Sequence, residues 1–117
     1  MSAESTIYSV LSGASGITAL VSDRIYPDIL PQKKPLPAVV YTRSGTEYLS
    51  TLGSPAVASS ATIEIWCFAL TRPAAEALAD AVLTALIVAK HYPSDRRPEY
   101  EEETQTCASV VVCNIWQ

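Results

Sequence analysis

Few side chains in this sequence are suited to nucleophilic chemistry. The one histidine, His91, would need a nucleophile and an orienting carboxylate to act as a general base, roles open to Cys67 and to Asp80 or Asp95. The sequence has no Gly-x-Ser-x-Gly elbow and no catalytic cysteine motif around these residues. Because His91 follows a predicted helix, its expected role is to satisfy carbonyls at the helix C-terminus. The sequence therefore predicts no catalytic residue and no enzyme.

An acidic run near the C-terminus is the best candidate for a metal site. Its carboxylates, the oxygen ligands that divalent cations prefer, belong to Glu99, Glu101, Glu102 and Glu103. The run lacks the glycine turn and the Asn/Asp spacing of a calcium loop. A solvated acidic strand edge, which deters strand-to-strand aggregation, is the favoured interpretation.

The cysteines do not form a recognisable metal motif. They are three in number, none stands in Cys-x-x-Cys spacing, and all lie in strand-like apolar contexts: Cys67, Cys107 and Cys113. The expectation is free buried thiols in a reducing compartment rather than a disulfide. With four glycines the chain also has no Gly-rich phosphate loop. We expect no metal and no cofactor.

Charge and hydropathy narrow the class of protein. The formal net charge is −4 and the basic residues are scattered, which argues against general nucleic-acid affinity. No apolar run reaches the roughly 18 residues of a membrane span, and no signal peptide is readable, so a cytosolic protein without membrane attachment is expected. Hydrophobic residues make up 49% of the sequence and charged residues only 17%. This apolar excess suggests that part of the protein surface is apolar and is covered in an oligomer.

A predicted strand and helix at residues 60–89 organise the chain. Over residues 62–70, Ile63, Ile65, Cys67 and Ala69 fall on one face of the strand, while Glu64, Trp66 and Phe68 fall on the other. Both faces therefore need partners. The helix begins at residues 71–73, with Thr71 or Arg72 as its N-cap. Its apolar stripe comprises Ala75, Leu78, Val82, Ala85, Leu86 and Ala89.

The flanking segments complete a small mixed domain. The pattern predicts an N-terminal helix, a short second helical turn, brief extension at residues 25–27, a proline-rich loop over 28–37 and a strand over 38–44. Residues 47–60 resemble a long loop with almost no charge, although their start could extend the preceding strand into a hairpin arm. A polar turn at 94–98, an exposed acidic strand at 99–105 and a strand at 107–116 follow.

This order predicts the α+β class. We expect one domain over residues 1–117, with an antiparallel sheet and an N-terminal helix and one long helix packed on one face. The sequence has no internal repeat.

Leu-Val-x-Asp-Arg-Ile-Tyr-Pro at residues 20–27 is followed about a dozen residues on by Pro-x-Val-Val-Tyr at 37–41. An Ile-Glu-Ile-Trp strand at 63–66, an alanine-rich helix and a closing Ile-Trp at 115–116 follow in order. Taken together, these segments, of which the first two are the most specific, resemble the tail completion (tail terminator, or tail-to-head joining) proteins of long-tailed bacteriophages and prophages. The likeness extends over nearly the whole chain.

The resemblance implies a structural virion protein without catalytic residues. Such proteins assemble into a ring, typically hexameric, which caps the tail tube, ends its polymerisation and presents a surface to the head. The implied partners are other copies of the chain, the tail tube protein and a head completion or connector protein. The implied location is the virion tail, and the bacterial host cytoplasm during assembly.

Two sets of residues are our hypothetical assembly sites. A subunit or tail-tube interface would comprise Glu47, Tyr48, Leu49, Leu52, Trp66 and Phe68. A lumen lining that repels DNA would comprise Glu99, Glu101, Glu102 and Glu103. The alternative is a cytosolic adaptor that binds another protein through the loop at 31–37 or through an open sheet face.

Overall fold

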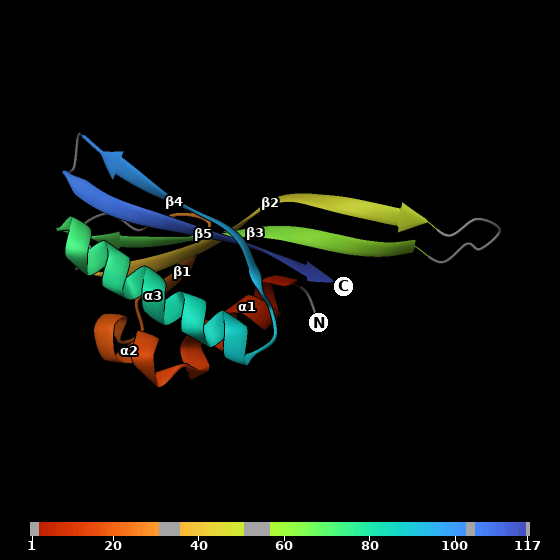
Figure 1. Ribbon diagram of the computed structural model, residues 1–117, viewed down its shortest axis with the longest axis horizontal. Coiled ribbons are helices and arrows are strands. Elements are labelled where there is room, and N and C mark those ends of the chain that lie inside the picture. Colours follow the sequence, from red (N-terminus) through yellow and green to blue (C-terminus); the bar gives the residue numbers. More distant parts are fainter. Residues whose placement is uncertain (1–2, 31–35, 51–56, 103–104, 117) are drawn as a thin grey trace.

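The computed structural model of the protein describes residues 3–30, 36–50, 57–102 and 105–116. The described residues form three helices and five strands, arranged as in Figure 1. The elements, in chain order, are α1 (Ala3–Gly13), α2 (Ser15–Val21), β1 (Ile25–Pro27), β2 (Ala38–Ser50), β3 (Val57–Ala69), α3 (Arg72–Val88), β4 (Pro93–Glu101) and β5 (Thr106–Trp116).

The strands form one sheet in the order β1-β2-β3-β5-β4, with the helices packed on one of its faces (Figure 1). The predicted α+β class, with an N-terminal helix and a long helix on one face of the sheet, is confirmed. Every strand pair is antiparallel except β1 and β2, which run parallel from Ile25 opposite Val39 to Pro27 opposite Tyr41. The short parallel strand is the one departure from a purely antiparallel sheet.

The core lies between the sheet and the helices. Alternation along β3 sends Ile63, Ile65 and Cys67 toward the helices, where all three are buried. The helices contribute apolar stripes at four-residue spacing: Ile7 and Leu11 from α1, and Leu78, Val82 and Leu86 from α3. No helix among the described residues has the length and apolar character needed to cross a membrane.

Local backbone chemistry fixes both ends of α3. Thr71 is the N-cap, as one of the two predicted alternatives, and its hydroxyl accepts a hydrogen bond from the backbone N–H of Ala74 at 3.3 Å. At the other end Lys90 has a positive φ of 64°. The N–H of Lys90 donates to Ile87 and that of His91 donates to Leu86, which closes a Schellman motif.

Two segments differ from their sequence-based assignment. Residues 47–50 and 57–60, predicted as parts of a loop, extend β2 and β3 into a long hairpin, so the hairpin alternative is the correct one. Residues 94–98, predicted as a turn, lie within β4. The polar residues there are accommodated because Arg96 binds Glu76 and Asp80 on α3. Pro98 lies on an edge strand, which needs no outward N–H donor.

Candidate functional site

The two main residues considered for nucleophilic chemistry, Cys67 and His91, lie in the core and at the end of a helix, respectively. Cys67 is completely buried on the helix-facing side of β3, and this burial raises the pKa of its thiol to about 12. A thiol in that environment does not ionise at neutral pH, so it is a poor nucleophile. His91 follows α3 and satisfies a helix carbonyl as predicted, through its backbone N–H, which donates to Leu86 at 2.9 Å.

The other candidate ligands do not gather either. All three cysteines are free, and burial raises the pKa of Cys113 to about 11. Within the described ranges there is no group of three or more His, Cys, Asp or Glu side chains placed to hold a metal ion.

The acidic run occupies the end of β4 and the turn that follows it. Glu99 is half-buried, and its Oε1 accepts a hydrogen bond from Nε of Arg97 at 3.1 Å. Glu101, the last residue of β4, and Glu102 are exposed. Glu103 lies outside the described residues. The exposed carboxylates therefore project from one end of the sheet, as the solvated-edge interpretation expects.

The face of the sheet opposite the helices carries an aromatic pair. Trp66 and Phe68, two residues apart on β3, are stacked with ring centroids 5.9 Å apart and an interplanar angle of 18°. Both rings are half-buried, and the indole N–H of Trp66 donates to Oε1 of Glu64 at 3.2 Å. The sequence correctly predicted that these three residues share a face, because side chains alternate along a strand.

Arg97 on β4 reaches across the sheet to contact Trp66 and Glu64 on β3. Its guanidinium carbon lies 5.9 Å from the centroid of the Trp66 ring, within cation–π range. The same guanidinium forms ion pairs with Glu64 at 3.4 Å and Glu99 at 3.1 Å. The hydrogen bond to Glu99, and the nearby charge of Glu64, raise the pKa of Arg97. Sequence patterns do not indicate this cluster, because they predict a turn over residues 94–98 and not a strand beside β5.

A shallow pocket of about 340 Å³ opens beside the aromatic pair. Its lining residues come from β2, β3 and the segment after β1: Asp28, Leu30, Val40, Thr42, Glu64, Trp66 and Phe68. The hydroxyl of Thr42 donates to Oδ1 of Asp28 at 3.2 Å. The pocket thus combines two carboxylates with aromatic walls.

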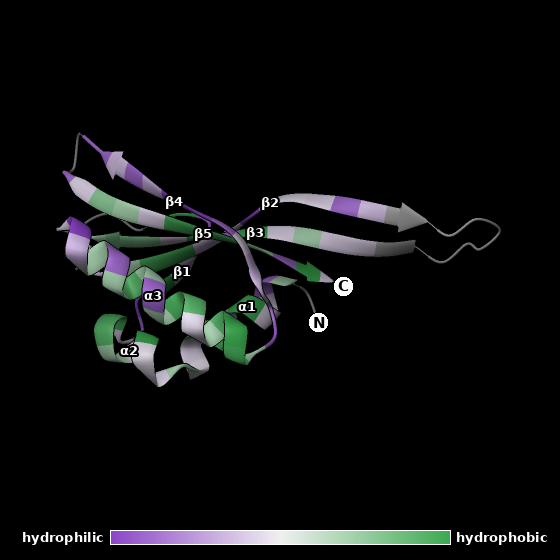
Figure 2. Cartoon of the chain, in the orientation of Figure 1, coloured by the Kyte–Doolittle hydropathy of each residue, from purple (hydrophilic) through white to green (hydrophobic). Residues whose placement is uncertain are grey.

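The distal halves of β2 and β3 form a second surface, which we call the arm (residues 47–50 and 57–59). β5 pairs with β3 as far as Trp116 opposite Ser60, and the described residues beyond that point pair only between β2 and β3. Figure 1 shows this ribbon projecting from the body, and Figure 2 shows mostly intermediate hydropathy along it. Glu47 and Tyr48 are exposed, Tyr48 by 72%. The backbone of Leu49 belongs to the arm, whereas Leu52 lies outside the described residues.

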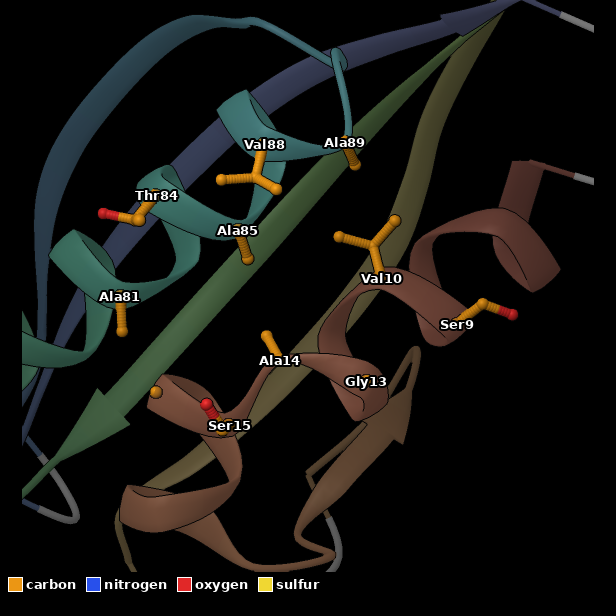
Figure 3. A pocket seen from close by; sticks show the side chains of 11 residues that line it. Ser9, Val10, Gly13, Ala14, Ser15, Ala81, Thr84, Ala85, Val88 and Ala89 are labelled. Atoms are coloured by element: carbon orange, nitrogen blue, oxygen red, sulfur yellow. The ribbon is translucent and has the colours of Figure 1, made fainter.

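A groove between the helices was not predicted. It has a volume of about 660 Å³ and separates α1 and α2 from the C-terminal half of α3. In Figure 3 the side chains of Ala81, Ala85 and Ala89 face Val10 and Ala14 across it. At these positions the small side chains of α3 leave open space between the helices. Their spacing of four residues along one helical face is the signal that could have revealed the groove.

Comparisons with known proteins identify a family and solved structures that this chain is similar to. A family model described as "Tail completion protein gp17" matches residues 5–117. No curated protein matches by sequence. Of solved structures, 13 chains match. One of these, from a structure titled "Virion of native gene transfer agent (GTA) particle", is similar with a TM-score of 0.71 and 18% identity, over 94% of this chain and 90% of that chain. At this identity the likeness concerns the fold.

Proposed function

Because the chain belongs to the tail completion protein gp17 family, which its sequence matches over residues 5–117, we propose that it ends the tail of a long-tailed phage or prophage. In this proposal several copies form a ring, hexameric in the first instance, on top of the tail tube. The ring stops tube polymerisation and presents its other side to a head completion or connector protein. The protein then resides in the virion tail, after assembly in the host cytoplasm.

The observation that carries the proposal is the family match over nearly the whole chain. The fold agrees with a virion component, since the structure resembles a chain of a gene transfer agent virion. The site agrees with a structural role, since Cys67 is buried with its pKa raised to about 12 and His91 uses its backbone to close α3.

The arm supports the ring. A two-stranded ribbon alone is at best marginally stable in water, so an arm without a third strand gains stability from a neighbour. Its exposed Tyr48 offers the kind of large, amphipathic side chain enriched in protein interfaces. We assign Glu47, Tyr48, Leu49 and Leu52 to contacts with the adjacent subunit or the tail tube.

The open sheet face is the second proposed contact. A ring is built from two different surfaces on each subunit that meet head to tail. Trp66 and Phe68 are half-buried on a face that none of the described helices covers, as Figure 1 shows for the sheet as a whole. We assign these two residues to the surface that receives a neighbouring protein.

The acidic end of the sheet is the proposed lumen lining. Negative walls repel DNA phosphates, so that the genome passes without being held. The exposed Glu101 and Glu102 fit this role directly, and Glu99 and Glu103 belong to the same acidic run.

A tube-capping experiment tests the function. Purified tail tube protein is allowed to polymerise alone and with increasing amounts of this protein, and tube length is measured by negative-stain electron microscopy. We expect shorter tubes that carry a ring at one end, and free rings near six subunits by native mass spectrometry. A protein that remains monomeric at high concentration, or that leaves tube length unchanged, contradicts the proposal.

A further inference from the structure

We propose that the pocket beside Trp66 and Phe68 holds a lysine or arginine side chain of the protein that docks on the open sheet face. The inference rests on the proposed function in one respect, namely that this face is an assembly surface. It adds the chemistry of the docking partner: a basic side chain that projects from a loop or helix into the pocket.

The walls suit a long side chain with a cationic end. The stacked rings of Trp66 and Phe68 form one side of the pocket, with Leu30 and Val40 adding apolar surface. Lysine and arginine bury an aliphatic stem against apolar groups while the head remains at a polar site. A volume of about 340 Å³ accommodates one such side chain.

The charges select a cation. Among the described residues that line the pocket, Asp28 and Glu64 carry the ionisable carboxylates and none is basic. Glu64 is already paired with Arg97 and Asp28 accepts from Thr42, but an apolar anchor would shield both carboxylates from water without adding a charged partner, which costs free energy. A guanidinium or ammonium group would instead form charge-assisted hydrogen bonds with them. The Thr42 hydroxyl, 3.2 Å from Oδ1 of Asp28, helps to orient that carboxylate.

The protein itself shows how a guanidinium binds on this face. Arg97 lies 5.9 Å from the Trp66 ring centroid and 3.4 Å from Oε2 of Glu64. The pocket repeats the same ingredients, an aromatic ring beside a carboxylate, on the β2 side of Trp66, with Asp28 as the added acid. A cation–π contact with such a ring attracts a guanidinium or ammonium group.

A bound metal ion fits the pocket less well. Divalent cations prefer several oxygen ligands, and aromatic rings offer none. Across the part of the chain that the structure describes, no three candidate ligands come together. The pocket chemistry therefore favours a basic side chain.

An NMR titration of the intact protein tests the inference directly. The probe is N-acetyl-arginine amide, and its neutral isostere N-acetyl-citrulline amide is the control. The signal followed is the indole N–H of Trp66, with that of Trp116 as an internal reference. We expect a saturable shift of the Trp66 signal with the arginine probe, at millimolar concentration, and weakening at high salt. The citrulline probe should leave this signal unchanged.

A matched pair of variants connects the response to the pocket. Asp28→Asn keeps an oxygen that can accept from Thr42 but removes the charge, so we expect affinity for the arginine probe to fall about two- to fivefold, the range of a partly exposed ion pair. Asp23→Asn removes an exposed acid outside the pocket and should leave affinity unchanged. Equal binding of the two probes, or equal losses in the two variants, overturns the inference.

A further variant tests whether the pocket is filled by a side chain of the same protein instead of by a docking partner. Lys33→Gln/Lys34→Gln removes the two lysines closest in sequence to Leu30. If this variant binds the arginine probe and the native protein does not, the pocket is filled by the chain itself and the docking inference is wrong. The titration does not depend on ring formation or tube capping. A failure of the pocket inference would appear as a lack of arginine binding, and a failure of the proposed function would appear as a lack of rings or of tube capping, so the two failures are distinguishable.

Discussion

Neighbouring residues on β3 serve opposite sides of the sheet. Ile65 is fully buried against the helices, whereas Trp66 is half-buried on the open face. The register continues this division into β4, where Arg96 binds α3 and Arg97 binds Glu64 on the open face. Single substitutions can therefore separate folding from assembly within one strand.

We predict that Trp66→Ala weakens assembly more than it weakens the fold. The ring is only half-buried, so its removal should lower the free energy of unfolding by about 1–2 kcal/mol, against about 3–4 kcal/mol for Ile65→Ala in the core. Urea unfolding of the monomer measures the first effect and native mass spectrometry of the ring measures the second. If Trp66→Ala unfolds the protein as severely as Ile65→Ala does, Trp66 is a core residue and not an interface residue.

The buried thiols make a prediction about pH. Burial raises the pKa of Cys67 to about 12 and that of Cys113 to about 11, whereas an unfolded thiol ionises near pH 8.5. Above that pH the unfolded state releases these protons and the folded state retains them, so the free energy of unfolding falls as pH rises from about 8.5 to 12. Cys67→Ala/Cys113→Ala should lose this part of the pH dependence in urea unfolding.

Thiol reactivity provides an independent measurement of the same burial. At pH 8 the native protein should leave Cys67 and Cys113 unmodified by Ellman's reagent, and unfolding in urea should expose all three cysteines. Rapid labelling of native Cys67 would contradict both the burial argument and the non-catalytic role assigned to this residue.

Residue patterns predicted the faces of β3 but not what covers them. Alternation is a property of the backbone, so Ile63, Ile65 and Trp66 could be assigned to faces from the sequence alone. The contact between Arg97 and Trp66 joins residues 31 positions apart in the numbering and depends on β5 lying between their strands. Local patterns carry no information about that strand order.

At the scale of elements, the arm is the segment where the sequence was ambiguous. Residues 57–61 are small or polar, so they give no contrast between an apolar and a polar face and resemble a loop. The hairpin forms because backbone pairing continues from the body, with a register shift between Arg43 and Gly45. β4 was missed for a related reason: its polar residues resemble a turn until α3 supplies Glu76 and Asp80 for Arg96.

We predict that the arm is dispensable for folding and required for the ring. Replacing residues 48–59 with Asn-Gly joins Glu47 to Ser60, which are paired in the hairpin, through a turn suited to two strands. Because β5 does not pair with β3 beyond Ser60, the free energy of unfolding should change by less than about 1 kcal/mol. Light scattering should show that the shortened protein no longer forms rings.

A matched variant at the other end of the sheet controls for turn replacement. Replacing residues 102–105 with Asn-Gly joins Glu101 to Thr106, which are also paired. This variant should assemble normally, since it retains the arm and the Trp66 face. Rings of unchanged mass from the arm-shortened protein would show that the arm is not a subunit contact.

At the scale of the whole molecule, the sheet separates the two proposed roles. Its register places the arm at one end and the acidic turn after Glu101 at the other, and the molecule is 52 Å along its longest axis. Figure 1 shows the arm and the end of β4 pointing in opposite directions. A subunit built in this way can contact a neighbour through one end while the other end faces a different environment.

The acidic end of the sheet allows the orientation of the subunit about the ring axis to be tested. If the acidic end lines the lumen, a single-particle reconstruction of the assembled ring should place Glu101 and Glu102 closer to the axis than Tyr48. Glu101→Lys/Glu102→Lys should then turn a wall that repels phosphates into one that binds them, so that the ring retains double-stranded DNA at low salt and releases it as salt increases. The native ring should not retain DNA under the same conditions. Glutamates on the outer surface of the reconstruction would rule out the lumen assignment while leaving the arm as a separate subunit contact.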